Sequence, residues 1–220
     1  MDQKYFDKLA QTVIDGEVEE CERLIKEGLE KGVNPLEAIE KGLGKGISKV
    51  GDDFGSGIVF LPELIMAADV MKRGAAILDE QIKSTGGKRK ALGKMVIGTV
   101  KGDIHDIGKS VVASVLQANG YDVTDIGIDI AVEAFIKSVK KNDADCLGMS
   151  TLLTLPLQVM GEVIEELKTE GLRNKVKVIV GGCPVTQEFA DEIGADAVGF
   201  DAADAVKKVG ELLGHYPSLK

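Results

Sequence analysis

The second half of the chain repeats one pattern five times, a short apolar run followed by a stretch of helical periodicity. The apolar runs are residues 95–100, 121–126, 146–149, 176–180 and 197–200, and the helical patterns cover about 107–119, 131–141, 156–170, 185–193 and 202–213. Five strand–helix repeats predict a doubly wound, parallel, five-stranded sheet of the α/β class. Because ligands of such sheets bind beyond the carboxyl ends of the strands, we expect the functional residues directly after the strands.

The first half has a different periodicity and predicts a separate helical unit. Residues 1–83 carry apolar residues at helical spacing in four segments, and Asn34-Pro35 supplies a helix cap followed by proline at the first helical position. Four helices with short connections predict a bundle. The polar, glycine-bearing stretch 84–90 is typical of a linker. We therefore expect a helical domain at residues 1–88 and an α/β domain at residues 89–220.

Charge and composition exclude several classes of function. The chain has 36 Asp and Glu residues against 27 Lys and Arg, a net charge of −9, which disfavours binding to nucleic acid or to an anionic membrane surface. No window approaches 18 consecutive apolar residues, and the N-terminus lacks the apolar region of a secretory signal. Three cysteines, an odd number, do not suggest a disulfide framework. We expect a cytoplasmic protein.

The loop after the first predicted strand holds the most informative histidine. His105 is one of two histidines, and the other, His215, lies near the C-terminus. The loop is not a phosphate-binding loop, because five residues rather than four separate Gly102 from the Gly-Lys-Ser that begins at Gly108, and two of the five are aspartates.

Asp103 precedes His105 by two residues, and a carboxylate bonded to one imidazole nitrogen is the usual partner of a metal-bound histidine. The alternative is that His105 only caps the helix expected near Ile107. One histidine cannot hold a free ion tightly, so we expect a metal that brings its other ligands with it, as in a macrocycle.

Three motifs in order resemble the cobalamin-binding signature of methionine synthase and of the corrinoid proteins in methyltransferase systems. They are Asp103-x-His105-x-x-Gly108, Ser150-x-Leu152 and Gly181-Gly182. The resemblance covers nearly the whole chain and implies a four-helix cap followed by a flavodoxin-like cobalamin domain. It also implies that cobalamin is bound base-off, with His105 as the lower axial ligand of cobalt and Asp103 bonded to the far imidazole nitrogen.

The same resemblance assigns the other residues of the cofactor site. The floor under the corrin would consist of Gly102, Asp103, Ile104, His105, Asp106, Ile107 and Gly108. The slot for the nucleotide tail would be lined by Ser150, Leu152, Thr154, Gly181, Gly182 and Ala202. The upper face of cobalt would be covered by Phe60, Leu64 and Val70. Structural explanations remain open: Ser150 could cap a helix, the glycine pair could form an ordinary turn, and the three cap residues could be bundle core.

One position departs from methionine synthase. There, a serine six residues past the one that matches Ser150 continues the relay from histidine and aspartate toward solvent. Here that position is Pro156, which has no hydroxyl and no backbone donor. The carboxylate of Asp103 would then be satisfied by Thr154, by a water or by nothing further.

The resemblance implies a corrinoid methyl carrier, a subunit rather than a self-sufficient enzyme. Its partners would be a donor-specific methyltransferase, an acceptor methyltransferase that serves a thiol or a tetrahydrofolate-type acceptor, and a reductive activase. The methyl donor (methanol, a methylamine, a methoxyaromatic or a betaine) is selected by the partner and is not encoded in the carrier.

Two other functions are compatible with the same fold. A cobalamin-dependent sensor would usually carry a DNA-binding domain, for which the chain has no spare length and no basic patch. A response-regulator-like domain would need a phosphorylatable aspartate after the third strand, and residues 150–156 offer none.

Overall fold

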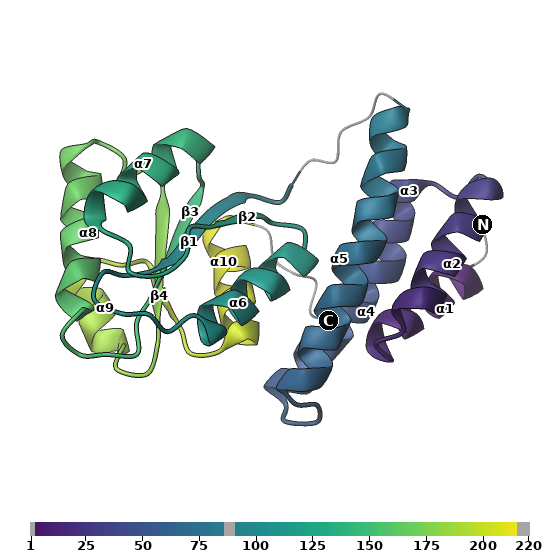
Figure 1. Ribbon diagram of the computed structural model, residues 1–220, viewed down its shortest axis with the longest axis horizontal. Coiled ribbons are helices and arrows are strands. Elements are labelled where there is room, and N and C mark those ends of the chain that lie inside the picture. Colours follow the sequence, from purple (N-terminus) through teal and green to yellow (C-terminus); the bar gives the residue numbers. More distant parts are fainter. Residues whose placement is uncertain (1–2, 86–90, 215–220) are drawn as a thin grey trace. The chain divides into compact units, whose positions relative to one another are not determined.

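The computed structural model describes residues 3–85 and 91–214, which form two compact units (Figure 1). The first unit is built mainly from the residues up to Ala91 and the second mainly from Leu92 onward. His215 and most of the predicted linker lie outside the described residues. Among the described helices, none is both long enough and apolar enough to cross a membrane.

The first unit is a bundle of four helical rods. The first two are α1 (Gln3–Ile14) and α2 (Val18–Glu30); the third combines α3 (Pro35–Glu37), the π-helical segment η1 (Ala38–Gly44) and α4 (Lys45–Gly55); the fourth is α5 (Leu61–Ser84). The third rod begins as predicted, because the Asn34 side chain accepts hydrogen bonds from the backbone N–H groups of Leu36 and Glu37. Gly46 lets α4 approach α1 closely, since a Cβ there would lie 2.5 Å from the carbonyl oxygen of Ala10.

The second unit is a five-stranded parallel sheet with helices on both faces. Its strands are β1 (Lys94–Thr99), β2 (Asp122–Asp125), β3 (Cys146–Ser150), β4 (Lys177–Gly181) and β5 (Ala197–Gly199), in the order β2-β1-β3-β4-β5. Its helices are α6 (Ile107–Ala118), α7 (Val132–Asn142), α8 (Leu157–Thr169), α9 (Gln187–Ile193) and α10 (Ala202–Leu212). The predicted fold class is confirmed, and the strand bounds differ from the predicted ones by no more than one residue.

The arrangement of the helices explains where a ligand can bind. Figure 1 shows α7, α8 and α9 on one face of the sheet and α6 and α10 on the other. Apolar residues of β1, β3 and β4, among them Val96, Leu147 and Val178, form the core beneath α7 and α8. The chain leaves β1 toward one face and β3 toward the other, so the loops that follow these two neighbouring strands diverge at a topological switch point.

Strand register places the ends of four strands in one row. Thr99 of β1 pairs with Ser150 of β3, Ser150 pairs with Gly181 of β4, and Gly181 pairs with Gly199 of β5. The three motifs at 103–108, 150–152 and 181–182 therefore meet at one edge of the sheet, although 41 residues separate the first from the second and 28 separate the second from the third.

Candidate functional site

The loop between β1 and α6 folds back over the end of β1. The backbone N–H of Asp103 donates to the carbonyl oxygen of Val100 at 3.2 Å, and the hydroxyl of Thr99 donates to the carbonyl oxygen of His105 at 2.8 Å. These two bonds close a tight loop, which buries Asp103 while leaving His105 at the surface. The loop thus separates an interior carboxylate from an accessible imidazole.

Asp103 and His105 form the central pair of the site. One carboxylate oxygen of Asp103, Oδ1, accepts a hydrogen bond from the backbone N–H of His105 at 2.9 Å and lies 2.5 Å from the imidazole Nδ1. Because an ionised carboxylate only accepts, Nδ1 is the donor, and in the neutral imidazole Nε2 then keeps its lone pair. The His105 side chain is 52% exposed, so this lone pair is accessible to a metal that approaches from outside the protein.

The second carboxylate oxygen of Asp103 is held from the loop after β3. Oδ2 accepts from the hydroxyl of Thr151 at 2.6 Å and from the backbone N–H of Leu152 at 2.6 Å. Burial raises the pKa of Asp103, but the bonds from Thr151, His105 and Leu152 lower it by more, so the pKa lies well below its ordinary value. The carboxylate is therefore a permanent acceptor for the imidazole.

Thr151 is the functional residue that the sequence analysis missed. The expectation that Asp103 relies on Thr154, a water or nothing further is wrong, because Thr151 is fully buried beside Asp103 whereas Thr154 is exposed. The backbone N–H of Thr151 donates to the carbonyl oxygen of Gly181, which keeps Thr151 in line with the strand end. The one signal in the sequence was a hydroxyl residue two positions after the end of the predicted strand at 146–149.

The glycine pair at the end of β4 permits close approach of Thr151, directly after β3, and of Gly199, the last residue of β5. Gly182 has φ +122°, and a Cβ there would lie only 1.8 Å from the carbonyl oxygen of Thr151. A Cβ at Gly181 would lie 2.9 Å from the carbonyl oxygen of Gly199. Only glycine fits these positions, which gives the pair a structural role. That it also leaves room for a flat base stays a prediction.

Large apolar side chains are exposed in the loops at this edge of the sheet. They are Ile104, Ile107 (the first residue of α6), Ile128, Leu152, Leu153, Leu155 and Phe200. Ile104 and Ile107 lie on either side of His105 in the chain, and a Cβ added at Gly108 would meet nothing within 4 Å. Apolar side chains gathered in this way around an accessible polar group are typical of a binding site rather than of ordinary surface.

The remaining residues predicted for this edge are all found in its loops or at its helix starts. Gly102, with φ +89°, and Asp106 are exposed, Ser150 is half-buried at the end of β3, and Ala202 is buried at the start of α10. The structure therefore brings the predicted floor and the predicted slot residues to one edge of one unit.

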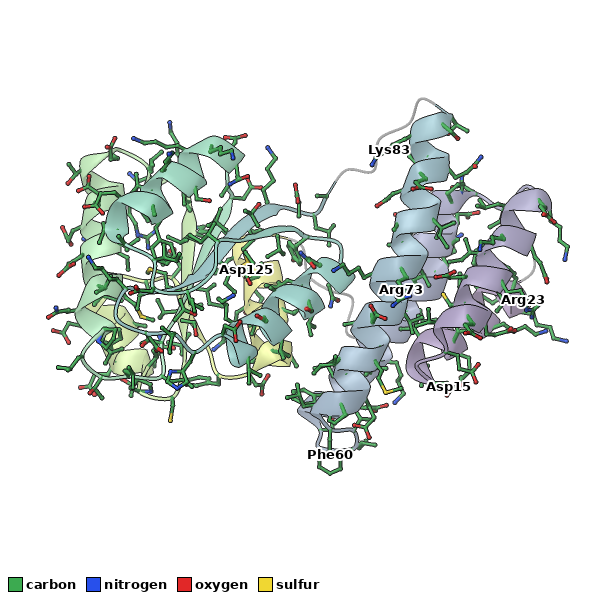
Figure 2. All side chains as sticks on the ribbon, in the orientation of Figure 1. Asp15, Arg23, Phe60, Arg73, Lys83 and Asp125 are labelled. Carbon is green, nitrogen blue, oxygen red and sulfur yellow. The ribbon has the colours of Figure 1, made fainter. Side chains whose placement is uncertain are left out.

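The three residues predicted for the helical unit do not share one environment. Phe60, directly before α5, is 68% exposed and points outward (Figure 2), whereas Leu64 and Val70 of α5 are buried in the core. The burial of Leu64 and Val70 agrees with the structural explanation that the sequence left open, in which they belong to the bundle core, and their place over cobalt stays a prediction. The exposed apolar residues near Phe60 in the chain are Ile58, Leu61, Ile65 and Met66.

These features fit a cofactor that is broad, largely apolar and already holds its own metal. His105 offers a single nitrogen ligand, which completes the coordination of such a metal but would not hold a bare ion tightly. The apolar side chains around it suit a macrocycle, and the open space at Gly108 leaves room for one. The residues present therefore fit a corrinoid.

Comparison with known proteins agrees with this chemistry. A B12 binding domain model matches residues 93–209, and a second B12 binding domain model matches residues 5–79. The chain is 49% identical over 192 residues to dimethylamine corrinoid protein 3 of Methanosarcina acetivorans, covering 86% of this chain and 89% of that one. It is 41% identical to trimethylamine corrinoid protein 2 of Methanosarcina mazei, covering 92% of this chain and 93% of that one.

Solved structures resemble both units. The methanol:cobalamin methyltransferase complex of Methanosarcina barkeri matches with a TM-score of 0.87 at 30% identity, covering 96% of this chain and 80% of that chain. A cobalamin-binding protein of Desulfitobacterium hafniense matches with a TM-score of 0.76 at 33% identity, covering 94% of this chain and 98% of that chain. The chain therefore belongs to the B12-binding domain family, and its cofactor is cobalamin.

Proposed function

We propose that this chain is the methyl-carrying corrinoid subunit of a methylamine methyltransferase system. The observation that carries the proposal is the pair of Asp103 and His105, in which a buried carboxylate fixes one nitrogen of the imidazole and leaves the other accessible. Relatives named as dimethylamine and trimethylamine corrinoid proteins support the methylamine assignment. The higher identity to the dimethylamine protein favours dimethylamine as the donor.

In this function the residues of the loop after β1 hold the cofactor base-off. His105 Nε2 would bind cobalt in place of the cofactor's own base, while Asp103 keeps the proton on Nδ1 and fixes the plane of the ring. Thr151 and the N–H of Leu152 hold the carboxylate in turn. Bound cobalamin would supply a cobalt centre that accepts and releases a methyl group.

The other predicted residues would shape the surroundings of the corrin. Gly102, Ile104, Asp106, Ile107 and Gly108 would lie beneath the ring, and the nucleotide tail would run past Ser150, Leu152, Thr154, Gly181, Gly182 and Ala202. From the helical unit, Phe60 remains a candidate for covering the upper face of cobalt, since it is the exposed one of the three residues predicted there.

A methyl carrier of this kind needs protein partners. We propose a donor-specific methyltransferase, an acceptor methyltransferase for a thiol or a tetrahydrofolate-type acceptor, and a reductive activase that restores the cofactor after oxidation. The structural match to a methanol:cobalamin methyltransferase complex supports the first of these. We propose a cytoplasmic location, which suits the exposed free thiol of Cys183.

The test is transfer of a labelled methyl group to the carrier. The full chain, loaded with cobalamin and reduced, is incubated with ¹⁴C-dimethylamine and a dimethylamine methyltransferase, and protein-bound label is measured after gel filtration. We expect label on the chain, none without the methyltransferase, and less with trimethylamine, monomethylamine or methanol and their own methyltransferases. Absence of label with all four donors would refute the carrier function and favour a cobalamin sensor.

A further inference from the structure

Asp129, in the loop between β2 and α7, has an unusual backbone conformation. Among the described residues, Asp129 and Asp143 are the two non-glycine residues with positive φ, at 55° and 49°. Asp143 is explained by its place at the C-terminus of α7, where a left-handed residue commonly ends a helix. Asp129 terminates no helix, so the strain of its conformation calls for another explanation.

Asp129 makes two hydrogen bonds to the loop that carries His105. Its side-chain Oδ1 accepts from the backbone N–H of Gly102 at 2.8 Å, and its own backbone N–H donates to the carbonyl oxygen of Asp103 at 3.0 Å. Gly102 itself has a left-handed backbone, with φ +89°. Asp129 thus holds both Gly102 and Asp103, which directly precede Ile104 and His105 in the loop. Asp103 is also the carboxylate partner of the imidazole.

The fold does not need the side chain of Asp129 to keep these two loops together. Backbone bonds already join them, from Thr99 to Gly127 at 3.0 Å, from Ile130 to Thr99 at 3.0 Å and from Lys101 to Ile130 at 2.9 Å. An ion pair between buried Lys109 of α6 and Asp125 at the end of β2 adds a further connection. None of these contacts involves Gly102 or Asp103. The contacts from the loop after β2 to those two residues come from Asp129.

Glycine would adopt the backbone of Asp129 without strain, so what aspartate adds at this position is an acceptor for Gly102. We propose that Asp129 is a positioning residue for His105: by fixing Gly102 and Asp103 it keeps the loop in the arrangement in which the imidazole can bind cobalt. The inference rests on the proposed role of His105 as axial ligand. It assigns to the loop after β2 a part in cofactor binding that neither the motifs nor the predicted site residues contain.

The test compares four proteins: wild type, Asp129→Gly, Asp129→Asn and Asp143→Gly. Glycine removes the acceptor and relieves the strain, so that variant keeps its fold. Asparagine keeps both an acceptor oxygen and a tolerance for positive φ. Asp143→Gly is the matched control, because it makes the same change at the other left-handed aspartate, which is distant in the chain from the His105 loop.

The probe is cobalt(II) cobinamide, a corrinoid without a nucleotide base, so any nitrogen coupling in its electron paramagnetic resonance spectrum comes from the protein. Titration of each protein gives the dissociation constant of the nitrogen-coupled form. We expect Asp129→Gly to raise this constant about fivefold, the factor that corresponds to one ordinary hydrogen bond. Asp129→Asn should stay within about twofold of wild type, as should Asp143→Gly, and thermal melting of Asp129→Gly should match that of Asp143→Gly.

Equal constants for Asp129→Gly and wild type would overturn the positioning role and leave His105 ligation intact. A fivefold loss that asparagine fails to restore would overturn it as well, because the acceptor would then not be the cause. Absence of nitrogen coupling in wild type would refute His105 as the ligand and the role of Asp129 together, so the failures of the two proposals are distinguishable.

Discussion

Replacing Thr151 by valine removes one bond from the network around Asp103. It also removes the two longer contacts of the same hydroxyl with Leu153, at 3.3 Å to the carbonyl oxygen and 3.2 Å from the backbone N–H. Valine has nearly the shape of threonine, so the 2.6 Å hydrogen bond to Oδ2 is lost without a cavity being left. A hydrogen bond to a charged group contributes about 1.5–3 kcal/mol. Since Oδ2 keeps the N–H of Leu152 and Oδ1 keeps both donors of His105, we expect a loss in the lower half of this range, about 2 kcal/mol.

Urea unfolding of the cofactor-free protein, followed by far-ultraviolet circular dichroism, measures this loss. With a slope of about 2 kcal/mol per molar urea, a loss of about 2 kcal/mol lowers the midpoint by about 1 M. Thr154→Val is the matched control, because Thr154 is an exposed threonine of the same loop and its change should cost less than about 0.5 kcal/mol. Equal midpoints for the two variants would show that the Thr151 hydroxyl does not hold Asp103, and the described network would be refuted.

Two further predictions concern the same edge of the sheet. Asp103→Asn should weaken cobinamide binding about 10–100-fold, because the amide no longer accepts as strongly from the imidazole; absorbance titration measures this, and unchanged affinity would contradict it. Gly182→Ala should cost about 2–5 kcal/mol of stability, since its Cβ would overlap the carbonyl oxygen of Thr151 at φ +122°. Gly108→Ala, near the start of α6 where an added Cβ meets open space, should instead stabilise the protein by up to about 1 kcal/mol. Thermal melting measures both changes in stability, and shifts of the same sign for Gly182→Ala and Gly108→Ala would contradict the described packing.

The order and bounds of the elements could be predicted because they depend on local periodicity. The runs that became the central strands β1, β3 and β4 are mostly buried between two layers of helices, and such runs are marked by residues that lie close in sequence. The rule that ligands bind at strand ends then located His105, Ser150 and Gly181 on one edge. Fold and position of the site were thus accessible without coordinates.

Partners of individual side chains could not be predicted in this way. Thr151 and Thr154 stand in the same loop, and the direction of the chain after β3 decides which hydroxyl reaches Asp103, 48 positions earlier in the sequence. Asp129 is likewise placed by a backbone conformation that the sequence does not mark. In α5, apolar residues occur on more than one side, so periodicity did not distinguish buried Leu64 and Val70 from their exposed neighbours Ile65 and Met66.

The central claim is that His105, and not the cofactor's own base, binds cobalt. The most direct measurement is the electron paramagnetic resonance spectrum of cobalt(II) cobalamin bound to protein whose histidines carry ¹⁵N. Because the cofactor's base keeps ¹⁴N, the two candidate ligands give different splitting. We predict doublets from a ¹⁵N ligand in the wild-type protein and their loss in His105→Ala. Triplets in the labelled wild-type protein would show that the cofactor's base remains bound to cobalt, and would contradict the account.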